Sequence, residues 1–107
     1  SKFEGLKKAL NNIGITGMTV FDVFGYGMQK GHSTYYRGVE TEADLLPKIR
    51  VEVVVSTVPV HEVVAAARKA LYTGNIGDGK IFIYNVENVI RVSTGDEGKK
   101  ALEYPTE

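Results

Sequence analysis

The chain has 107 residues, no cysteine and a formal net charge of zero. The lack of cysteine excludes disulfides and thiolate zinc sites, and the balanced charge argues against a generally basic nucleic-acid-binding protein. The length suits one domain, residues 1–107. Since no apolar run reaches the roughly 18 residues that span a membrane, we expect this domain to be soluble and located in the cytoplasm.

A helix and a strand are the first elements predicted. Ser1 and Glu4 have the spacing of a capping box at a helix start. Apolar residues then recur at helical spacing over residues 3–13, and Gly14 suits the position just past a helix end. Residues 18–24 are rich in β-branched and aromatic side chains, which predicts a strand.

The second half of the chain predicts a strand, a helix and two short strands. Apolar and polar residues alternate over residues 48–55, with one face formed by Ile49, Val51, Val53 and Val55. Pro59 can occupy the first turn of a helix. The buried stripe of this helix would consist of Val60, Val63, Val64, Ala67 and Leu71. Residues 80–84 and 89–92 predict short strands, and the polar tail from Thr94 is expected to be held loosely.

This order of elements is most of the βαββαβ pattern of an α+β, ferredoxin-like sandwich, without its first strand. That strand lies at the centre of the sheet, and its loss would leave unpaired backbone groups in an apolar setting. We therefore expect that residues preceding Ser1 are missing from this sequence. The alternative is that another segment fills the gap.

The connection over residues 27–46 is unusually long for two neighbouring strands, because loops beyond about 12–15 residues are usually functional or disordered. It carries the aromatic and arginine side chains of Tyr35, Tyr36 and Arg37. Such side chains are typical of interaction surfaces. A solvated loop without a partner remains the alternative.

Residues 25–32 and 73–80 form two glycine-rich, lysine-bearing segments beside predicted strands. Glycine lets backbone N–H groups approach a ligand, and lysine supplies charge for phosphate. Gly74, Gly79 and Lys80 have the spacing of a phosphate-binding loop (GxxxxGK), but Ile81 stands where that motif has a magnesium-binding Ser or Thr. This loop also leaves a helix and enters a strand, which excludes a Walker-type NTPase. Taken alone, each segment could be a simple turn.

No catalytic or metal-binding set stands out from the sequence. His32 and His61 lack the spacing of zinc ligands and are expected at the surface. No serine or threonine has an evident base partner, so we expect that the chain is not an enzyme.

Several separated motifs resemble the PII nitrogen-regulatory signal-transduction proteins. The resemblance runs over residues 6–95 without a gap in the long connection. It is carried by residues 12–20 (NIGITGMTV), 29–32 (QKGH), 36–38 (YRG), 46–48 (LPK) and 73–82 (TGNIGDGKIF). It implies a homotrimer with nucleotide sites in the clefts between subunits. ATP and ADP would compete there, and magnesium-ATP would permit 2-oxoglutarate to bind.

The resemblance also implies which residues form these sites. Nucleotide-binding residues would be Thr19, Gly27, Met28, Gln29, Val54, Thr73, Gly77, Asp78, Gly79, Lys80 and Arg91. Those for 2-oxoglutarate would be Gln29, Lys30, Gly31 and Lys48, with Gln29 also helping to coordinate Mg²⁺ through ATP. Residues 27–46 would be the T-loop, which docks on partners such as an ammonium transporter through Tyr36, Arg37 and Gly38.

Three positions depart from the pattern of many relatives. Met28, Asn75 and Ser93 stand where those relatives carry arginine or lysine at the phosphate site. Their loss of charge should weaken ATP binding or shift the preference between ATP and ADP. Two alternatives to the 2-oxoglutarate-responsive sensor therefore stay open: a divergent sensor of adenine nucleotides alone, and a slow ATPase.

Overall fold

The computed structural model of the chain describes residues 2–28, 34–36, 39–41 and 43–103. Its elements in chain order are α1 (Lys2–Asn12), β1 (Thr19–Met28), β2 (Thr34–Tyr36), β3 (Val39–Thr41), β4 (Ala43–Glu52), α2 (Val60–Leu71), the 3₁₀ turn η1 (Ile76–Asp78) and α3 (Lys99–Leu102). They fall into two compact units. One unit is Thr19–Glu52, and the other combines Ser1–Met18 with Val53–Glu107.

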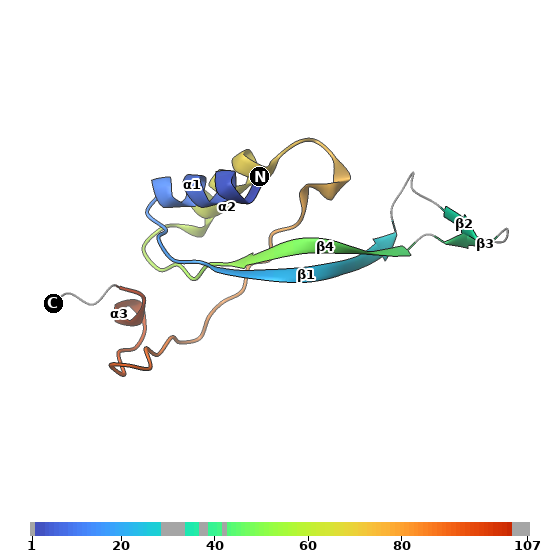
Figure 1. Ribbon diagram of the computed structural model, residues 1–107. Helices are drawn as coiled ribbons and strands as arrows, with labels where there is room; N and C mark the ends of the chain where they lie inside the picture. The colour runs from blue at the N-terminus through green and yellow to red at the C-terminus, as the bar shows by residue number, and fades with distance from the viewer. Residues whose placement is uncertain (1, 29–33, 37–38, 42, 104–107) are drawn as a thin grey trace. The chain divides into compact units, whose positions relative to one another are not determined.

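The Thr19–Glu52 unit consists of antiparallel strand pairs (Figure 1). Strands β1 and β4 pair in an unbroken register from Thr19 opposite Glu52 to Met28 opposite Ala43. Strand β1 therefore continues beyond the predicted residues 18–24, and β4 begins before the predicted residues 48–55 but ends at Glu52. Glycines 25 and 27 and Pro47 disfavour a strand locally, but the register of the strand pair continues through all three.

The stretch predicted as a long loop over residues 27–46 is therefore partly sheet. Its two ends belong to β1 and β4, and β2 pairs with β3 from Thr34 opposite Thr41 to Tyr36 opposite Val39. The prediction of a loop was wrong at these positions, because the pairing of β1 with β4 and of β2 with β3 depends on register, which local composition does not indicate.

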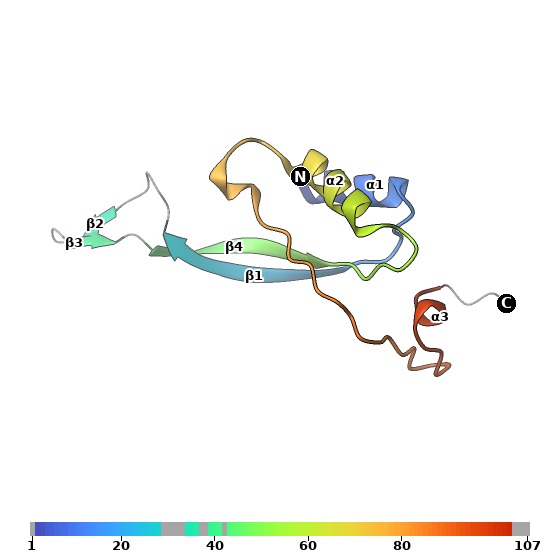
Figure 2. The ribbon, with the colours of Figure 1, turned by 180° about the vertical axis from the view of Figure 1, so that it is seen from behind.

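The core of the other unit lies between α1 and α2, which run side by side (Figure 2). Leu10 is 2% exposed and Leu6, Ile15 and Ala67 are also buried. Helix α1 thus buries the predicted apolar face. Gly14 follows it with φ of 97°, a backbone conformation that favours glycine.

Helix α2 shows two small differences from the prediction. Pro59 is the N-cap residue and has extended backbone angles, so it precedes the first turn. Val60 is exposed, whereas Ala67 is buried and Val63, Val64 and Leu71 are partly buried. The stripe therefore begins one turn later than its spacing predicted.

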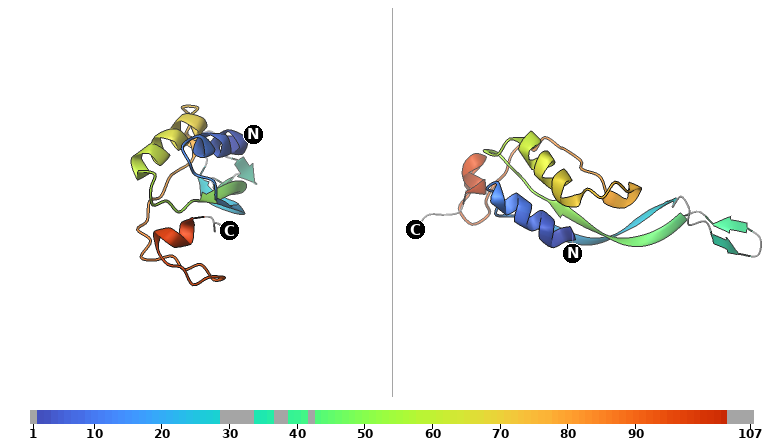
Figure 3. Two further views of the ribbon diagram at one scale, coloured as in Figure 1. Left: turned by 90° about the vertical axis from the view of Figure 1, so that its left-hand side faces the viewer. Right: turned by 90° about the horizontal axis from the view of Figure 1, so that it is seen from above.

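Residues 80–89 carry no strand assignment, although residues 80–84 predicted one. Figure 3 shows this segment, which follows η1, without a strand arrow. Among the described residues, the sole pairing nearby is an isolated bridge between Ile90 and Glu97. A strand needs a neighbour to satisfy its N–H and C=O groups, and the described chain offers none to residues 80–84. The predicted strands over residues 80–84 and 89–92 were wrong for this reason.

Candidate functional site

The segment between α2 and residue 80 is held together by the carboxylate of Asp78. One oxygen, Oδ2, accepts the backbone N–H of Thr73 at 2.7 Å and that of Gly74 at 3.0 Å. The other oxygen, Oδ1, accepts the hydroxyl of Thr73 and lies 3.5 Å from the ammonium of Lys2. The N–H of Asn75 is in turn donated to the Thr73 hydroxyl oxygen at 3.3 Å. The first residues of the loop, Thr73 and Gly74, are therefore bonded to Asp78 near its other end.

This arrangement stabilises the ionised form of Asp78. The hydroxyl and the backbone N–H of Thr73 are the main causes, with smaller contributions from the N–H of Gly74 and the charge of Lys2. Together they lower the pKa of Asp78 from 3.8 to about 2. The carboxylate is thus charged at any physiological pH and already has four donors.

Residues 77–80 of the same loop offer space and hydrogen-bond donors to a ligand. A Cβ on Gly77 would meet no atom of the described residues within 4 Å, and φ of Gly79 is 109°. Among the residues that the structure describes, the N–H groups of Gly77 and Lys80 have no acceptor. Lys80 itself is exposed. Free N–H groups, close backbone approach and a lysine are what an anionic phosphate requires.

In the Thr19–Glu52 unit, Lys48 lies on the strand pair opposite Val23. Its aliphatic stem crosses Gly25, where an added Cβ would come within 2.7 Å of Cδ and Cε. Thr19, the other predicted contact in this unit with a described side chain, pairs with Glu52 at the far end of β1. Lys48 as a whole is exposed.

Arg91 is engaged with the end of the chain. Its guanidinium lies 3.4 Å from Asp96 and donates to the backbone oxygens of Lys100 at 3.2 Å, Ala101 at 3.0 Å and Glu103. These oxygens surround the C-terminal end of α3, where a positive charge is favourable. The prediction of a loosely held tail from Thr94 was therefore wrong over residues 94–103.

The structure describes most of the predicted site residues, distributed over the two units. Thr19, Gly27, Met28, Tyr36 and Lys48 belong to the Thr19–Glu52 unit, and the other unit holds Val54, Thr73, Gly77, Asp78, Gly79, Lys80 and Arg91. Within the second unit, Thr73 and residues 77–80 form one loop. Gln29, Lys30, Gly31, Arg37 and Gly38 lie outside the described residues.

Two residues were missed from the sequence. Lys2 contacts Asp78 and lies within 3.5 Å of the backbone oxygen of Leu71, although no local pattern marks a lysine at a helix start as a partner of a distant loop. Gly25 belongs to the glycine-rich segment 25–32, but in the structure its lack of a side chain leaves room for the stem of Lys48. The register of β1 against β4 would have been needed to find it.

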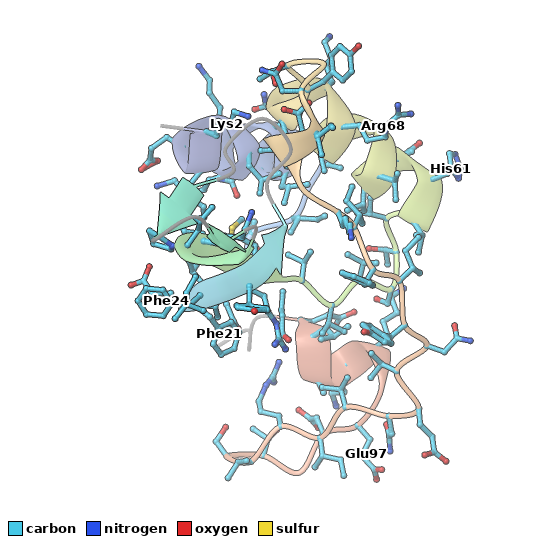
Figure 4. All side chains as sticks on the ribbon, turned by 90° about the vertical axis from the view of Figure 1, so that its right-hand side faces the viewer. Lys2, Phe21, Phe24, His61, Arg68 and Glu97 are labelled. Atoms are coloured by element: carbon cyan, nitrogen blue, oxygen red, sulfur yellow. The ribbon has the colours of Figure 1, made fainter. Side chains whose placement is uncertain are left out.

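Three other features of the described residues concern His61, possible metal-binding groups and possible membrane-spanning helices. His61 projects outward from α2, as expected for a surface residue (Figure 4). In the described ranges, no three His, Cys, Asp or Glu side chains are grouped so that they could hold a metal ion. No helix in this part of the chain has the length and apolar character needed to cross a membrane.

Comparison with known proteins identifies the family. Residues 1–96 match the family "Nitrogen regulatory protein P-II". A curated relative of that name from Pasteurella multocida is 48% identical over 101 residues, which cover 94% of this chain and 90% of the relative. The chain therefore belongs to the nitrogen regulatory protein P-II family of signal transducers.

Solved structures agree with this assignment. The structure of GlnK from Bacillus subtilis is 46% identical and superposes with a TM-score of 0.79, covering 94% of this chain and 89% of that one. A second structure, titled a complex of B. subtilis GlnK with ATP, is 40% identical with a TM-score of 0.78 and covers 94% and 85%. The predicted family and the α+β, ferredoxin-like fold are confirmed.

Proposed function

We propose that this regulator binds ATP or ADP at the loop of residues 73–80. The observation that carries the proposal is the loop itself: Asp78 holds the backbone of Thr73 and Gly74, while the N–H groups of Gly77 and Lys80 have no acceptor among the residues that the structure describes. The similarity to the B. subtilis chain solved with ATP supports the same ligand class. Backbone amides and the Lys80 ammonium would hold the phosphates.

The remaining nucleotide contacts follow from family resemblance. Thr19, Val54 and Thr73 would lie near the adenine and ribose, and Gly27, Met28 and Gln29 would lie near the phosphates. Arg91 would add charge only after leaving part of its carbonyl partners, since its NH2 group donates to three backbone oxygens. This competition, together with Met28, Asn75 and Ser93, favours a nucleotide site of moderate affinity.

Magnesium and 2-oxoglutarate would complete the signal. The amide oxygen of Gln29 is a ligand type that Mg²⁺ accepts beside ATP phosphates. Lys48 suits a carboxylate of 2-oxoglutarate because the residue is exposed, carries an ammonium group, and has its stem over Gly25. Lys30 and Gly31 would complete that site. Unequal binding to different T-loop conformations would then select among them.

We further propose a homotrimer that acts in the cytoplasm, where ATP and ADP are found. Phe82, Ile83 and Tyr84 are 71%, 64% and 80% exposed in the single chain, an apolar stretch that suits an interface between copies. Through Tyr36, Arg37 and Gly38, the T-loop would dock on a target such as an ammonium transporter.

Calorimetric titration tests the proposal. ATP and ADP are titrated into the protein, each with and without Mg²⁺ and 2-oxoglutarate, with Lys80→Ala as the nucleotide variant and exposed Lys69→Ala as its control. We expect nucleotide binding that Lys80→Ala weakens, and 2-oxoglutarate binding only with magnesium-ATP. Binding without a 2-oxoglutarate response would indicate the sensor of adenine nucleotides alone. Turnover of ATP that disappears in Lys80→Ala would indicate the slow ATPase.

A further inference from the structure

We propose that Asp78 is a positioning residue for the nucleotide. Its carboxylate holds Thr73 and Gly74, the first residues of the 73–80 loop, and does not itself bind phosphate or metal. This inference rests on the proposed function, because it assigns a role within the same loop. It separates Asp78 from its neighbours Gly77 and Lys80, whose backbone N–H groups are the proposed ligand donors.

The first argument is that the carboxylate is already saturated with donors. Thr73 supplies its N–H and its hydroxyl, Gly74 supplies its N–H, and Lys2 supplies an ammonium. The side chain of Asp78 is only 20% exposed. A metal ion could use this carboxylate only by displacing several charge-assisted hydrogen bonds, which are the stronger kind.

The second argument is electrostatic. A phosphate beside an uncompensated carboxylate would be repelled, since both groups are negative. Here the donors of Thr73, Gly74 and Lys2 compensate the charge of the Asp78 carboxylate. The backbone N–H groups of Gly77 and Lys80 stay unpaired among the described residues. The same residue can therefore stand in an anion-binding loop and stabilise it without opposing the ligand.

The third argument is that the contact links three separate pieces of backbone. The Lys2 ammonium, in the first turn of α1, lies 3.5 Å from Asp78 and 3.5 Å from the backbone oxygen of Leu71 at the end of α2. A cation at a helix C-terminus is favourable. Lys2 and Asp78 together thus anchor the loop to both helices of its unit. Figure 4 labels Lys2 on α1.

The test compares Asp78→Asn and Asp78→Ala with Glu62→Gln, which neutralises an exposed carboxylate on α2. Amide hydrogen exchange is first measured without nucleotide. We expect the Thr73 and Gly74 amides to exchange about tenfold faster in Asp78→Ala and less so in Asp78→Asn, whose amide oxygen can still accept. Exchange at Leu10 and Ala67 reports the helix core and should stay unchanged.

Nucleotide affinity is then measured in the same variants by calorimetry. We expect ATP and ADP to weaken by the same factor, about tenfold in Asp78→Ala, with and without Mg²⁺. Glu62→Gln should bind as the unmodified protein does. An effect confined to Mg²⁺ or to ATP would indicate direct contact and would overturn the inference.

Two further results would also contradict it. Unchanged exchange at Thr73 and Gly74 would show that the carboxylate does not hold the loop, and faster exchange with unchanged affinity would show that the held loop is not needed. If the unmodified protein binds neither nucleotide, the proposed function fails and the positioning role fails with it. Exchange data would then still show whether Asp78 closes the loop.

Discussion

Gly25 leaves the space in which the stem of Lys48 crosses strand β1. A Cβ on residue 25 would come within 2.7 Å of both Cδ and Cε of Lys48. Such a separation is far below ordinary van der Waals contact, so one of the two groups must move. The flexible outer part of a lysine moves more easily than a backbone held in a ladder from Thr19 to Met28.

We therefore predict that Gly25→Ala displaces Lys48 without unfolding the protein. Binding of 2-oxoglutarate with magnesium-ATP should weaken about tenfold, comparable to the loss of one charge-assisted contact, while binding of ATP alone should change little. Calorimetry with each ligand makes the comparison. Gly17→Ala is the matched control, since a Cβ added there would have no atom within 4 Å in the part of the chain that the structure describes. Equal 2-oxoglutarate affinity in both variants would contradict the placement of Lys48.

Gly77 and Gly79 should respond differently to alanine. The space around a Cβ at Gly77 is open, so Gly77→Ala should leave the melting temperature unchanged and yet weaken ATP binding by obstructing close approach to the backbone. Gly79 has φ of 109°, so alanine there should also destabilise the fold, by about 1 kcal/mol. Thermal melts and ATP titrations separate the two effects. Full ATP affinity in Gly77→Ala would exclude a phosphate beside this residue.

Asp78 should titrate at an unusually low pH. Its pKa is about 2 in the folded chain and 3.8 ordinarily, so its contribution to stability is complete above pH 4 and is lost as pH falls toward 2. Carboxyl chemical shifts followed by NMR should give a midpoint near 2. In Lys2→Met the midpoint should rise only slightly, because the charge of Lys2 lowers the pKa of Asp78 less than the hydrogen bonds from Thr73 and Gly74 do. A midpoint near the ordinary value would show that the Thr73 and Gly74 bonds do not form in solution.

Truncating Leu10 should lower the stability of the fold strongly, because this residue of α1 is 2% exposed in the core that α1 forms with α2. We predict that Leu10→Ala lowers the free energy of unfolding by about 2–5 kcal/mol. Leu10→Met, which nearly conserves volume, should cost less than about 1.5 kcal/mol. Urea unfolding of both variants provides the measurement. Similar losses for the two would mean that packing volume does not decide stability here.

The helices and the approximate positions of β1 and β4 could be predicted because their signals are local. Apolar spacing marked α1 and α2, and Gly14 marked the end of α1. The failures concern what is not local. The extension of β1 to Met28 depends on pairing with β4, and residues 80–84 lacked the neighbour that a strand needs.

The same distinction holds for the site. The glycine-rich loop of residues 73–80 was recognisable from composition, since glycine and lysine have a clear physical use beside phosphate. The contact of Lys2 with Asp78 joins residues 76 positions apart and left no pattern to read. Arg91 was expected at a phosphate, but in the structure its guanidinium contacts Asp96 and three backbone oxygens. Because every residue carries a backbone oxygen, no sequence motif predicts such acceptors.

The bonds from Arg91 to the backbone of residues 100–103 have a practical consequence for handling this protein. Proteolytic trimming before Lys100 would remove these backbone acceptors and leave the guanidinium with its ion pair to Asp96, although Arg91 itself had not been altered. Preparations with intact and trimmed ends would then differ in the chemistry available at position 91. Intact-mass spectrometry of each batch would reveal whether a disagreement between laboratories originates in the sample.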